Sequence, residues 1–301
     1  VGIVGESGSG KTMICRTMIG TLERRGGKIL SGDVIFEGQS LAKASESDWK
    51  KLRGKSIGYV PQSALAGPNP VLTIEAQLAE ALRNTGDTKN IKARSKELLD
   101  LVKIRRVDTV MKQYPYQLSG GMRQRVMIAM ALACKPKLLI ADEPTTALDV
   151  TVQKTILELL KELQVQNQLS IILITHDLDL VADVADKIVV LYKGELIEKG
   201  TTRSILKNPQ HWYTKALLAC RPVANAKGSR LPVVADFIES GMVSDHSSVI
   251  SRQSPINPHH SPLTTQHSCF SPILTVENLS VHFEEKKKLF IKPKIFKAVD
   301  N

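Results

Sequence analysis

The amino-acid sequence predicts an α/β fold with a mostly parallel sheet and an inserted helical subdomain. Short apolar runs alternate with stretches of helical periodicity along most of the chain, a pattern typical of parallel sheets covered by helices. A glycine-rich loop of the phosphate-binding type follows the first apolar run. From about residue 70 to about residue 135 the periodicity is helical, which predicts a helical insertion between two strands.

Three apolar runs are short and partly β-branched, as expected for strands that are buried on both faces of a parallel sheet: Leu138–Ala141, Ser170–Thr175 and Lys187–Tyr192. In the insertion, Leu78, Leu82, Leu98 and Leu101 recur at helical spacings, which favours helices there. The predicted strands are Val1–Val4, Asp33–Phe36, Ser56–Pro61, Leu138–Ala141, Ser170–Thr175 and Lys187–Tyr192. The predicted helices outside the insertion are Lys11–Leu22, Val150–Gln166 and His176–Ala185.

The composition excludes two broad classes of protein. Hydrophobic residues make up 42% of the 301 residues and charged residues 24%, so the chain is not wholly disordered. No window approaches 18 consecutive apolar residues, so no membrane span is predicted. The 41 basic and 30 acidic residues give a net charge of +11, which fits either a protein at an anionic membrane surface or a polyanion binder. Aromatic residues are only 4%, which disfavours stacking on single-stranded nucleic acid.

The strongest motif begins directly after the first predicted strand. Residues 5–12 read Gly-Glu-Ser-Gly-Ser-Gly-Lys-Thr and match the phosphate-binding pattern G-x-x-x-x-G-K-[ST], or P-loop. Glycines allow backbone N–H groups to surround phosphate oxygens, and the following helix N-terminus adds positive charge. Lys11 is expected to reach the phosphates and Thr12 to coordinate Mg²⁺. The residues predicted to bind the nucleotide here are Gly5, Glu6, Ser7, Gly8, Ser9, Gly10, Lys11 and Thr12.

Two adjacent acids end a later apolar strand, at Asp142 and Glu143. Neighbouring strand residues point in opposite directions, so the two carboxylates are expected to have different roles. Asp142 is expected to hold Mg²⁺, and Glu143 to act as the general base for the attacking water. The alternative is an acid pair that only caps the next turn.

His176 and Gln62 each follow a predicted strand. Because the carboxyl ends of parallel strands meet at one edge of a sheet, His176 is expected to open onto the same face as Asp142 and Glu143. There it would bond the terminal phosphate and hold the water in line, while Gln62 is placed for Mg²⁺ and the water. The alternative for a lone histidine after a strand is a purely structural role.

Residues 118–125 read Leu-Ser-Gly-Gly-Met-Arg-Gln-Arg and open a helix in the insertion. This motif resembles the signature sequence of ABC-type ATPases, and the resemblance extends over residues 1–220. It implies that Gln62 is the Q-loop glutamine, Thr146–Asp149 the D-loop and His176 the switch histidine. It also implies a head-to-tail pair of such domains, in which Ser119, Gly120 and Gly121 act on the nucleotide of the partner domain. Asp149, at the end of the D-loop, is expected to bind nucleotide as well.

Three stretches are similar to the ATPases of dipeptide, oligopeptide and glutathione importers, at Tyr114–Ala131, Ala141–Val152 and Asn208–Leu218. Two departures occur: Ser63–Gly67 differs from the acidic-Pro-Met segment usual after the Q-loop glutamine, and Trp212 replaces a common proline. The first departure touches the surface that couples to the permease.

After residue 220 the composition changes. Residues 221–272 are expected to form a C-terminal extension and a linker, since Ser244–Pro272 contains eight Ser, four Pro and four of the seven His. His259, His260, His267 and Cys269 could alternatively be metal ligands, although none of the four cysteines forms a Cys-x-x-Cys pair. Residues 273–301 resemble the opening strand of a second, truncated ABC domain, so a piece of a tandem ATPase is expected.

Taken together, the resemblance implies an ATP- and Mg²⁺-dependent subunit that powers peptide import. The expected partners are a second ABC domain, membrane permease subunits and, indirectly, a solute-binding protein, with no nucleic acid. The expected location is peripheral, on the cytoplasmic face of the plasma membrane. The alternatives are a soluble ABC-type ATPase that acts on nucleic acid or ribosomes, or an inactive fragment.

Overall fold

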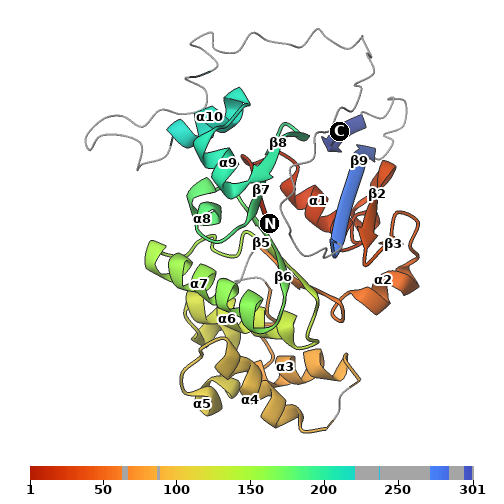
Figure 1. Cartoon of the computed structure of the whole chain (residues 1–301). Helices are drawn as coiled ribbons and strands as arrows, with labels where there is room; N and C mark the ends of the chain where they lie inside the picture. Colours follow the sequence, from red (N-terminus) through yellow and green to blue (C-terminus); the bar gives the residue numbers. More distant parts are fainter. Residues whose placement is uncertain (63–66, 87–88, 221–236, 238–271, 285–294, 300–301) are drawn as a thin grey trace, which may run out of the picture.

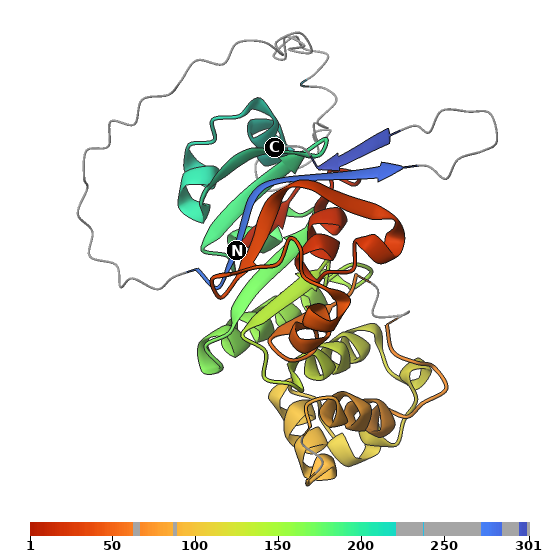
Figure 2. The same cartoon turned by 90° about the vertical axis from the view of Figure 1, so that its right-hand side faces the viewer.

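The computed structural model describes residues 1–62, 67–86, 89–220, 237, 272–284 and 295–299. Figure 1 and Figure 2 show an α/β core with a helical part at one end and a small antiparallel sheet along one side. The predicted fold class, α/β with a mostly parallel sheet and inserted helices, is confirmed.

The central sheet has the strand order β4-β5-β6-β1-β7-β8. Its strands are β1 (Gly2–Val4), β4 (Ile57–Val60), β5 (Leu138–Asp142), β6 (Ser170–Thr175), β7 (Lys187–Tyr192) and β8 (Glu195–Thr201). All neighbours pair in parallel except β7 and β8, which are antiparallel. The carboxyl end of β1 therefore lies in the middle of the sheet, between β6 and β7.

Alternate strand residues pack into two separate hydrophobic clusters, one on each face of the central sheet. On β5, Leu139 and Ala141 join the cluster formed with helices α6 (Gly120–Leu132) and α7 (Val150–Gln166). Leu138 and Ile140 join the cluster formed with α1 (Lys11–Met18) and the antiparallel sheet. Burial on both faces explains why these strands are continuous apolar runs.

The helical part is an insertion between β4 and β5 and lies at the lower end of the molecule in Figure 1. The side chains of Thr73 and Ser119 accept hydrogen bonds from backbone N–H groups in the first turns of α3 and α6, which fixes where these helices begin. The helices here are α3 (Ile74–Arg83), α4 (Ile91–Leu101), α5 (Val107–Met111) and α6, with a short 3-10 turn at Pro115–Gln117.

The antiparallel sheet has the strand order β10-β9-β2-β3. Its strands are β2 (Gly27–Phe36), β3 (Gln39–Ser40), β9 (Leu274–Glu284) and β10 (Ile295–Val299). The strand expected near residue 273 is thus present as β9, and it pairs with β2, which lies near the other end of the chain. Whether residues 273–301 also open a second domain stays a prediction.

Other differences concern short elements. The predicted helix His176–Ala185 is shorter, because Asp177 accepts from the N–H groups of Asp179 and Leu180 and α8 begins only at Leu178. The helix predicted for Lys11–Leu22 ends at Met18 and is followed by a 3-10 turn at Glu23–Arg25. The elements that the sequence did not predict are α2 (Glu46–Leu52), β3, β8, β10, α9 (Thr202–Lys207) and α10 (Trp212–Ala219).

Several expectations fall on residues that the structure does not describe. The linker, with His259, His260, His267 and Cys269, lies outside the described residues, as does most of the Ser63–Gly67 segment. Among the residues that are described, no group of three or more His, Cys, Asp or Glu could hold a metal ion. Within the same residues, every helix is too short or too polar to cross a bilayer.

Candidate nucleotide site

The phosphate loop connects the centre of the parallel sheet to α1. Gly8 and Gly10 have φ angles of +84° and +95°, which side-chain-bearing residues rarely adopt. Gly5 lies so close to β7 that a Cβ there would be 2.3 Å from the carbonyl oxygen of Leu191. Gly10 directly precedes α1, and its carbonyl accepts from the N–H groups of Met13 and Ile14. The N–H groups of Lys11 and Thr12, which come first, have no carbonyl one turn earlier in the helix, and such groups can bind an anion.

Lys11 is 5% exposed and lies inside the loop. Its Nζ donates to the carbonyl oxygens of Gly5 and Glu6 at 2.7 and 2.8 Å. Burial lowers the pKa of Lys11, an effect that Glu143 and Asp142 partly offset. The loop carbonyls therefore hold the ammonium group, and the charges of Glu143 and Asp142 favour its protonated form.

The loop is also fixed from its far side by a residue that the sequence did not single out. The hydroxyl oxygen of Tyr213, on α10, accepts a hydrogen bond from the backbone N–H of Glu6 at 3.0 Å. Tyr213 is fully buried, and its ring lies 4.3 Å from that of Tyr192. In the sequence, Tyr213 stood out only as part of Asn208–Leu218, a stretch that is similar to importer ATPases but to which no function was assigned.

Asp142 ends β5 and is 2% exposed. Its Oδ2 lies 3.5 Å from the hydroxyl of Tyr59, and its Oδ1 is buried with no hydrogen-bond partner among the described residues. Burial, followed by repulsion from Glu143, raises the pKa of Asp142. A buried carboxylate oxygen without a donor is a place for a cation, and oxygen is the ligand that Mg²⁺ prefers.

Glu143 is contacted by three side chains from different segments. Gln62 Nε2 and Thr146 Oγ1 each donate to Glu143 Oε2 at 2.9 Å, and His176 Nδ1 lies 3.4 Å from Oε1. Burial raises the pKa of Glu143, but these three contacts outweigh it and leave the pKa below its ordinary value. The carboxylate is thus kept ionised, with a fixed orientation.

A cavity of about 390 Å³ lies over these groups. The residues that line it are Ser7, Gly8, Gly10, Lys11, Thr12, Met13, Gln62 and Glu143. The structure therefore brings the phosphate loop together with Gln62 and Glu143, and through Glu143 with His176. Of the other predicted loop residues, Ser9 is buried with its hydroxyl unpaired among the described residues.

The signature residues Ser119, Gly120 and Gly121 do not line this cavity. Ser119 caps α6 by accepting from the N–H of Met122 at 3.3 Å, and a Cβ on Gly121 would lie 2.7 Å from Val152 Cγ1. Asp149 likewise caps α7, accepting from the N–H of Val152 at 3.1 Å. The N-terminal turns of α6 and α7 therefore lie side by side.

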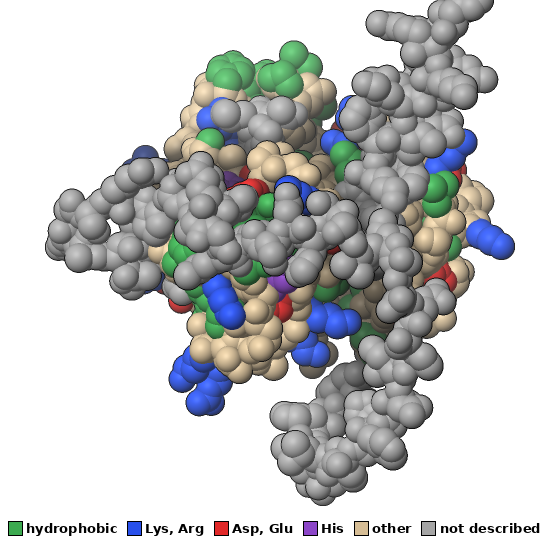
Figure 3. All heavy atoms as spheres, turned by 90° about the horizontal axis from the view of Figure 1, so that it is seen from above, with side chains coloured by type: hydrophobic (Ala, Val, Ile, Leu, Met, Phe, Trp, Pro, Cys, Tyr) green, Lys and Arg blue, Asp and Glu red, His purple; other side chains and the backbone are tan. Residues whose placement is uncertain are grey.

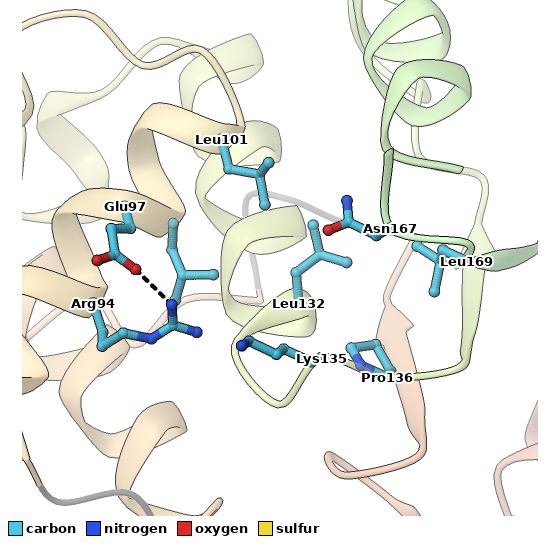
Figure 4. Close-up of a pocket in the computed structure, with 9 residues that line it drawn as sticks. Arg94, Glu97, Leu101, Leu132, Lys135, Pro136, Asn167 and Leu169 are labelled. Carbon is cyan, nitrogen blue, oxygen red and sulfur yellow. Dashed lines mark hydrogen bonds and ion pairs between the residues drawn. The ribbon is translucent and has the colours of Figure 1, made fainter. Parts of the chain in front are cut away.

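A second cavity, of about 340 Å³, lies between the helical part and the core (Figure 4). Leucines from α4, α6 and the segment before β6 form much of its wall, and Arg94 is paired with Glu97 at 2.5 Å. On the face that Figure 3 shows, Lys and Arg side chains are scattered among other types instead of forming one patch.

Known proteins resemble this chain along most of its length. The family description "ABC transporter" matches residues 1–146. The oligopeptide transport ATP-binding protein AppD of Bacillus subtilis is 45% identical over 78% of this chain and 72% of its own length. The dipeptide transport ATP-binding protein DppD of the same species is 46% identical, over 76% and 69%. The glutathione import ATP-binding protein GsiA of Shigella boydii is 44% identical over 76% of this chain but 38% of its own length.

Solved structures share the fold. A dimeric, post-hydrolysis structure of the ATP-binding cassette MJ0796 with ADP and phosphate has a TM-score of 0.57 at 28% identity and covers 67% of this chain and 84% of that chain. The structure of cbiO1 from Clostridium perfringens, part of an ABC transporter complex, has a TM-score of 0.60 at 28% identity and covers 69% and 78%. With its phosphate loop, acid pair and signature helix on this fold, the chain belongs to the ATP-binding cassette ATPases of the ABC transporter family.

Proposed function

We propose that this chain is the ATP-hydrolysing subunit of an importer for peptides of the dipeptide, oligopeptide or glutathione type. The observation that carries the proposal is the set of three contacts that hold Glu143 over the phosphate-loop cavity. The peptide and glutathione transport names of its relatives support the solute class. They favour it over the alternative of an ATPase that acts on nucleic acid or ribosomes.

The phosphate loop is proposed to bind ATP through backbone N–H groups and Lys11. The Lys11 ammonium would exchange its bonds to the carbonyls of Gly5 and Glu6 for bonds to phosphate oxygens, at little cost because it is already desolvated. The hydroxyl oxygen of Tyr213 fixes the loop on the side away from the cavity by accepting a hydrogen bond from the N–H of Glu6. The loop is therefore arranged for phosphate before the nucleotide arrives.

The residues fit a Mg²⁺ ion that accompanies ATP. Thr12, Gln62 and Asp142 would hold it, and the unpartnered Oδ1 of Asp142 is the observation that fits best. When bound, such an ion neutralises charge that develops on the phosphates. Its charge would also favour the ionised form of Asp142, whose pKa burial otherwise raises.

Glu143 is proposed to accept a proton from the attacking water. Its lowered pKa keeps it ionised at neutral pH, and its Oε2 is oriented by Gln62 and Thr146. His176 is 60% exposed at its side chain and reaches Glu143 with one ring nitrogen, which would leave the rest of the ring for the terminal phosphate. Because Gln62 and His176 both contact Glu143, cleavage of the γ-phosphate would alter the surroundings of both side chains.

One proposed partner of this chain is another ABC domain. Ser119, Gly120, Gly121 and Asp149 lie away from the cavity of their own chain, so they are available to a nucleotide held by a partner. The helix N-termini of α6 and α7, which they begin, carry the partial positive charge that suits a phosphate.

A groove of about 690 Å³ between the core and the helical part is proposed to receive the permease. It combines arginines with apolar side chains and runs past Pro61, the residue before Gln62. Arg24 and Arg53 are both paired with Glu46. The lining includes Arg16, Ile19, Arg24, Arg25, Arg53, Tyr59, Pro61, Met127 and Met130. This connection would place the subunit on the cytoplasmic face of the membrane.

The test is Glu143→Gln, measured as ATP binding, ATP turnover and peptide uptake into vesicles that contain the permease. The amide keeps the shape of Glu143 but cannot take the proton, so nucleotide affinity is expected to stay near wild type while turnover falls by about 10²-fold or more. Glu195→Gln, on the exposed start of β8, is the matched control. Turnover near the wild-type rate in Glu143→Gln would remove Glu143 as the base, and uptake of other solutes but no peptide would overturn the solute class.

A further inference from the structure

Tyr59 and Asp142 lie on the same face of the central sheet, on neighbouring strands. Tyr59 on β4 is directly opposite Ile140 on β5, and Asp142 comes two residues after Ile140. Because alternate residues of a strand share a face, Asp142 is on the side of Ile140. An aromatic side chain can reach such a diagonal neighbour. The register of β4 and β5 therefore brings the Tyr59 hydroxyl to the carboxylate of Asp142.

The other side chains around Asp142 on this face are apolar. Ile140, Ile174 and Cys15, from β5, β6 and α1, belong to one hydrophobic cluster, and the ring of Tyr59 packs at its edge. The Tyr59 hydroxyl is the one side-chain hydrogen-bond partner that the described residues give Asp142. A phenylalanine would fill the same space, so packing alone does not explain the hydroxyl.

The hydroxyl engages one oxygen of the carboxylate and leaves the other free. A phenol keeps its proton at neutral pH, so it donates to a carboxylate. This long bond goes to Oδ2 at 3.5 Å, whereas Oδ1 is buried and unpartnered within the described part of the chain. The charge of Lys11 acts on Asp142, so the carboxylate lies beside the phosphate loop. Carboxylates that bind metals are usually hydrogen-bonded themselves, and losing such a partner lowers metal affinity.

We propose that Tyr59 is a positioning residue of the metal site: its hydroxyl fixes the carboxylate of Asp142 through Oδ2, and Oδ1 remains the oxygen for Mg²⁺. This rests on the proposed function, in which Asp142 helps to hold the ion, and it adds a residue that acts through Asp142. Tyr59 itself touches neither the ion nor the nucleotide in this role.

The test measures metal affinity instead of turnover. Each full chain is kept in excess over ADP, Mn²⁺ is titrated in as the probe for Mg²⁺, and free Mn²⁺ is followed by its EPR signal. The Kd of a fluorescent ADP analogue is also measured in EDTA, where it reports the fold and the loop without a metal. Tyr59→Phe is compared with Tyr192→Phe, which removes the same hydroxyl from a half-buried tyrosine of β7, a strand that does not neighbour β5.

Tyr59→Phe is expected to raise the Kd for Mn²⁺ several-fold and to leave the Kd for ADP in EDTA within twofold. The effect should stay below the roughly 10–100-fold loss typical of such partners, because the bond is long. Tyr192→Phe should match the wild type in both values. An unchanged Kd for Mn²⁺ in Tyr59→Phe would overturn the proposal. So would equal losses of Mn²⁺ binding and of metal-free ADP binding, which would give Tyr59 a purely structural role.

Asp142→Asn separates a failure of this proposal from a failure of the proposed function. It is expected to lose more Mn²⁺ affinity than Tyr59→Phe, and the double variant should lose no more than Asp142→Asn alone, because Tyr59 acts only through Asp142. A larger loss in the double variant would overturn the proposal. If Asp142→Asn weakens Mn²⁺ binding and Tyr59→Phe does not, only the role of Tyr59 is lost. If neither weakens it, the proposed metal site fails as well.

Discussion

At the scale of single residues, the phosphate loop depends on a side chain about 200 residues away. Tyr213 offers its hydroxyl oxygen to the N–H of Glu6, and the rest of its ring is packed among other aromatic side chains. Burial raises the pKa of Tyr213 to about 12, so its hydroxyl stays protonated at neutral pH. It acts as a neutral acceptor that leaves the loop free to bind anions.

Tyr213→Phe is predicted to weaken both folding and nucleotide binding. The substitution keeps the packed ring but removes the acceptor of a part-buried hydrogen bond from the Glu6 N–H, which costs roughly 0.5–1.5 kcal/mol. The expected result is a lower free energy of unfolding in urea and a several-fold higher Kd for ADP. Tyr192→Phe, in the adjacent ring, is the control, and an unchanged Kd in Tyr213→Phe would show that the bond does not position the loop.

A second prediction at this scale concerns the pH dependence of ATP hydrolysis, on the acid side of its kcat/KM profile. The pKa of Glu143 lies below the ordinary value of 4.5, since hydrogen bonds to the carboxylate outweigh its burial. Its contribution to stability is therefore present above that value and is lost as the pH falls through the folded pKa. Turnover by an ionised base should fall in the same window.

Thr146→Val removes the hydroxyl that donates to Glu143 Oε2. The pKa of Glu143 should then rise, and the acid limb of the kcat/KM profile should move to higher pH. Thr155→Val, whose hydroxyl bonds a backbone carbonyl on α7 instead, should leave the limb in place. If the kcat/KM profiles of both variants fall at the same pH as that of the wild type, the loss of activity at low pH is not caused by protonation of Glu143.

At the scale of elements, the contact between α6 and α7 requires a glycine. Gly121 stands in the first turn of α6, and a Cβ there would lie 2.7 Å from Val152 Cγ1 on α7. Gly121→Ala is predicted to lower the free energy of unfolding by roughly 1–3 kcal/mol, as overpacking does, despite the better helix propensity of alanine.

Val152→Ala added to Gly121→Ala makes room for the new methyl group and should recover most of the lost stability, measured by urea unfolding. Gly120→Ala, whose Cβ would lie 3.1 Å from a terminal carbon of Leu148, should cost less because that side chain can move. A double variant no more stable than Gly121→Ala alone would place the cost in the α6 backbone instead of in the helix contact.

The same elements show what sequence patterns can and cannot give. The strands β5, β6 and β7 and the helix α7 were predicted almost to the residue, because each is a continuous apolar run or a long amphipathic repeat. β8 was missed because its side chains are mostly exposed or half-buried, so it lacks an apolar pattern. The pairing of β9 with β2 joins distant segments, and no local pattern records it.

For the site, motif spacing predicted which residues meet. Gln62 and Glu143 do line one cavity with the phosphate loop, since strand ends share an edge of a parallel sheet. Tyr59, Thr146 and Tyr213 were not predicted to act there. Each works through one hydrogen bond to a group of the site, and such a bond depends on tertiary geometry that spacing in sequence does not contain.

At the scale of the whole molecule, the proposed pairing with a second ABC domain is supported by the separation of the cavity from the signature residues. The phosphate-loop cavity and the signature residues lie apart within one chain. Beside Asp149, at the start of α7, the side chain of Val150 is 79% exposed. It lies two residues before Val152, the residue of α7 that contacts Gly121 of the signature helix. An exposed valine at this point fits a surface that a second domain covers.

Val150→Lys is therefore predicted to prevent ATP-dependent pairing of two domains. The experiment uses chains that also carry Glu143→Gln, so that bound ATP is not consumed, and measures molar mass by light scattering with and without Mg-ATP. The reference chain should double in mass with ATP, whereas Val150→Lys should stay monomeric, because a lysine ammonium buried at the interface has no acceptor prepared for it. Val165→Lys makes the same change at a valine that is 76% exposed near the other end of α7, and it should pair like the reference. Pairing by all three proteins would show that the N-terminal turn of α7 lies outside the interface, and loss of pairing by both lysine variants would trace the effect to added charge instead of to position.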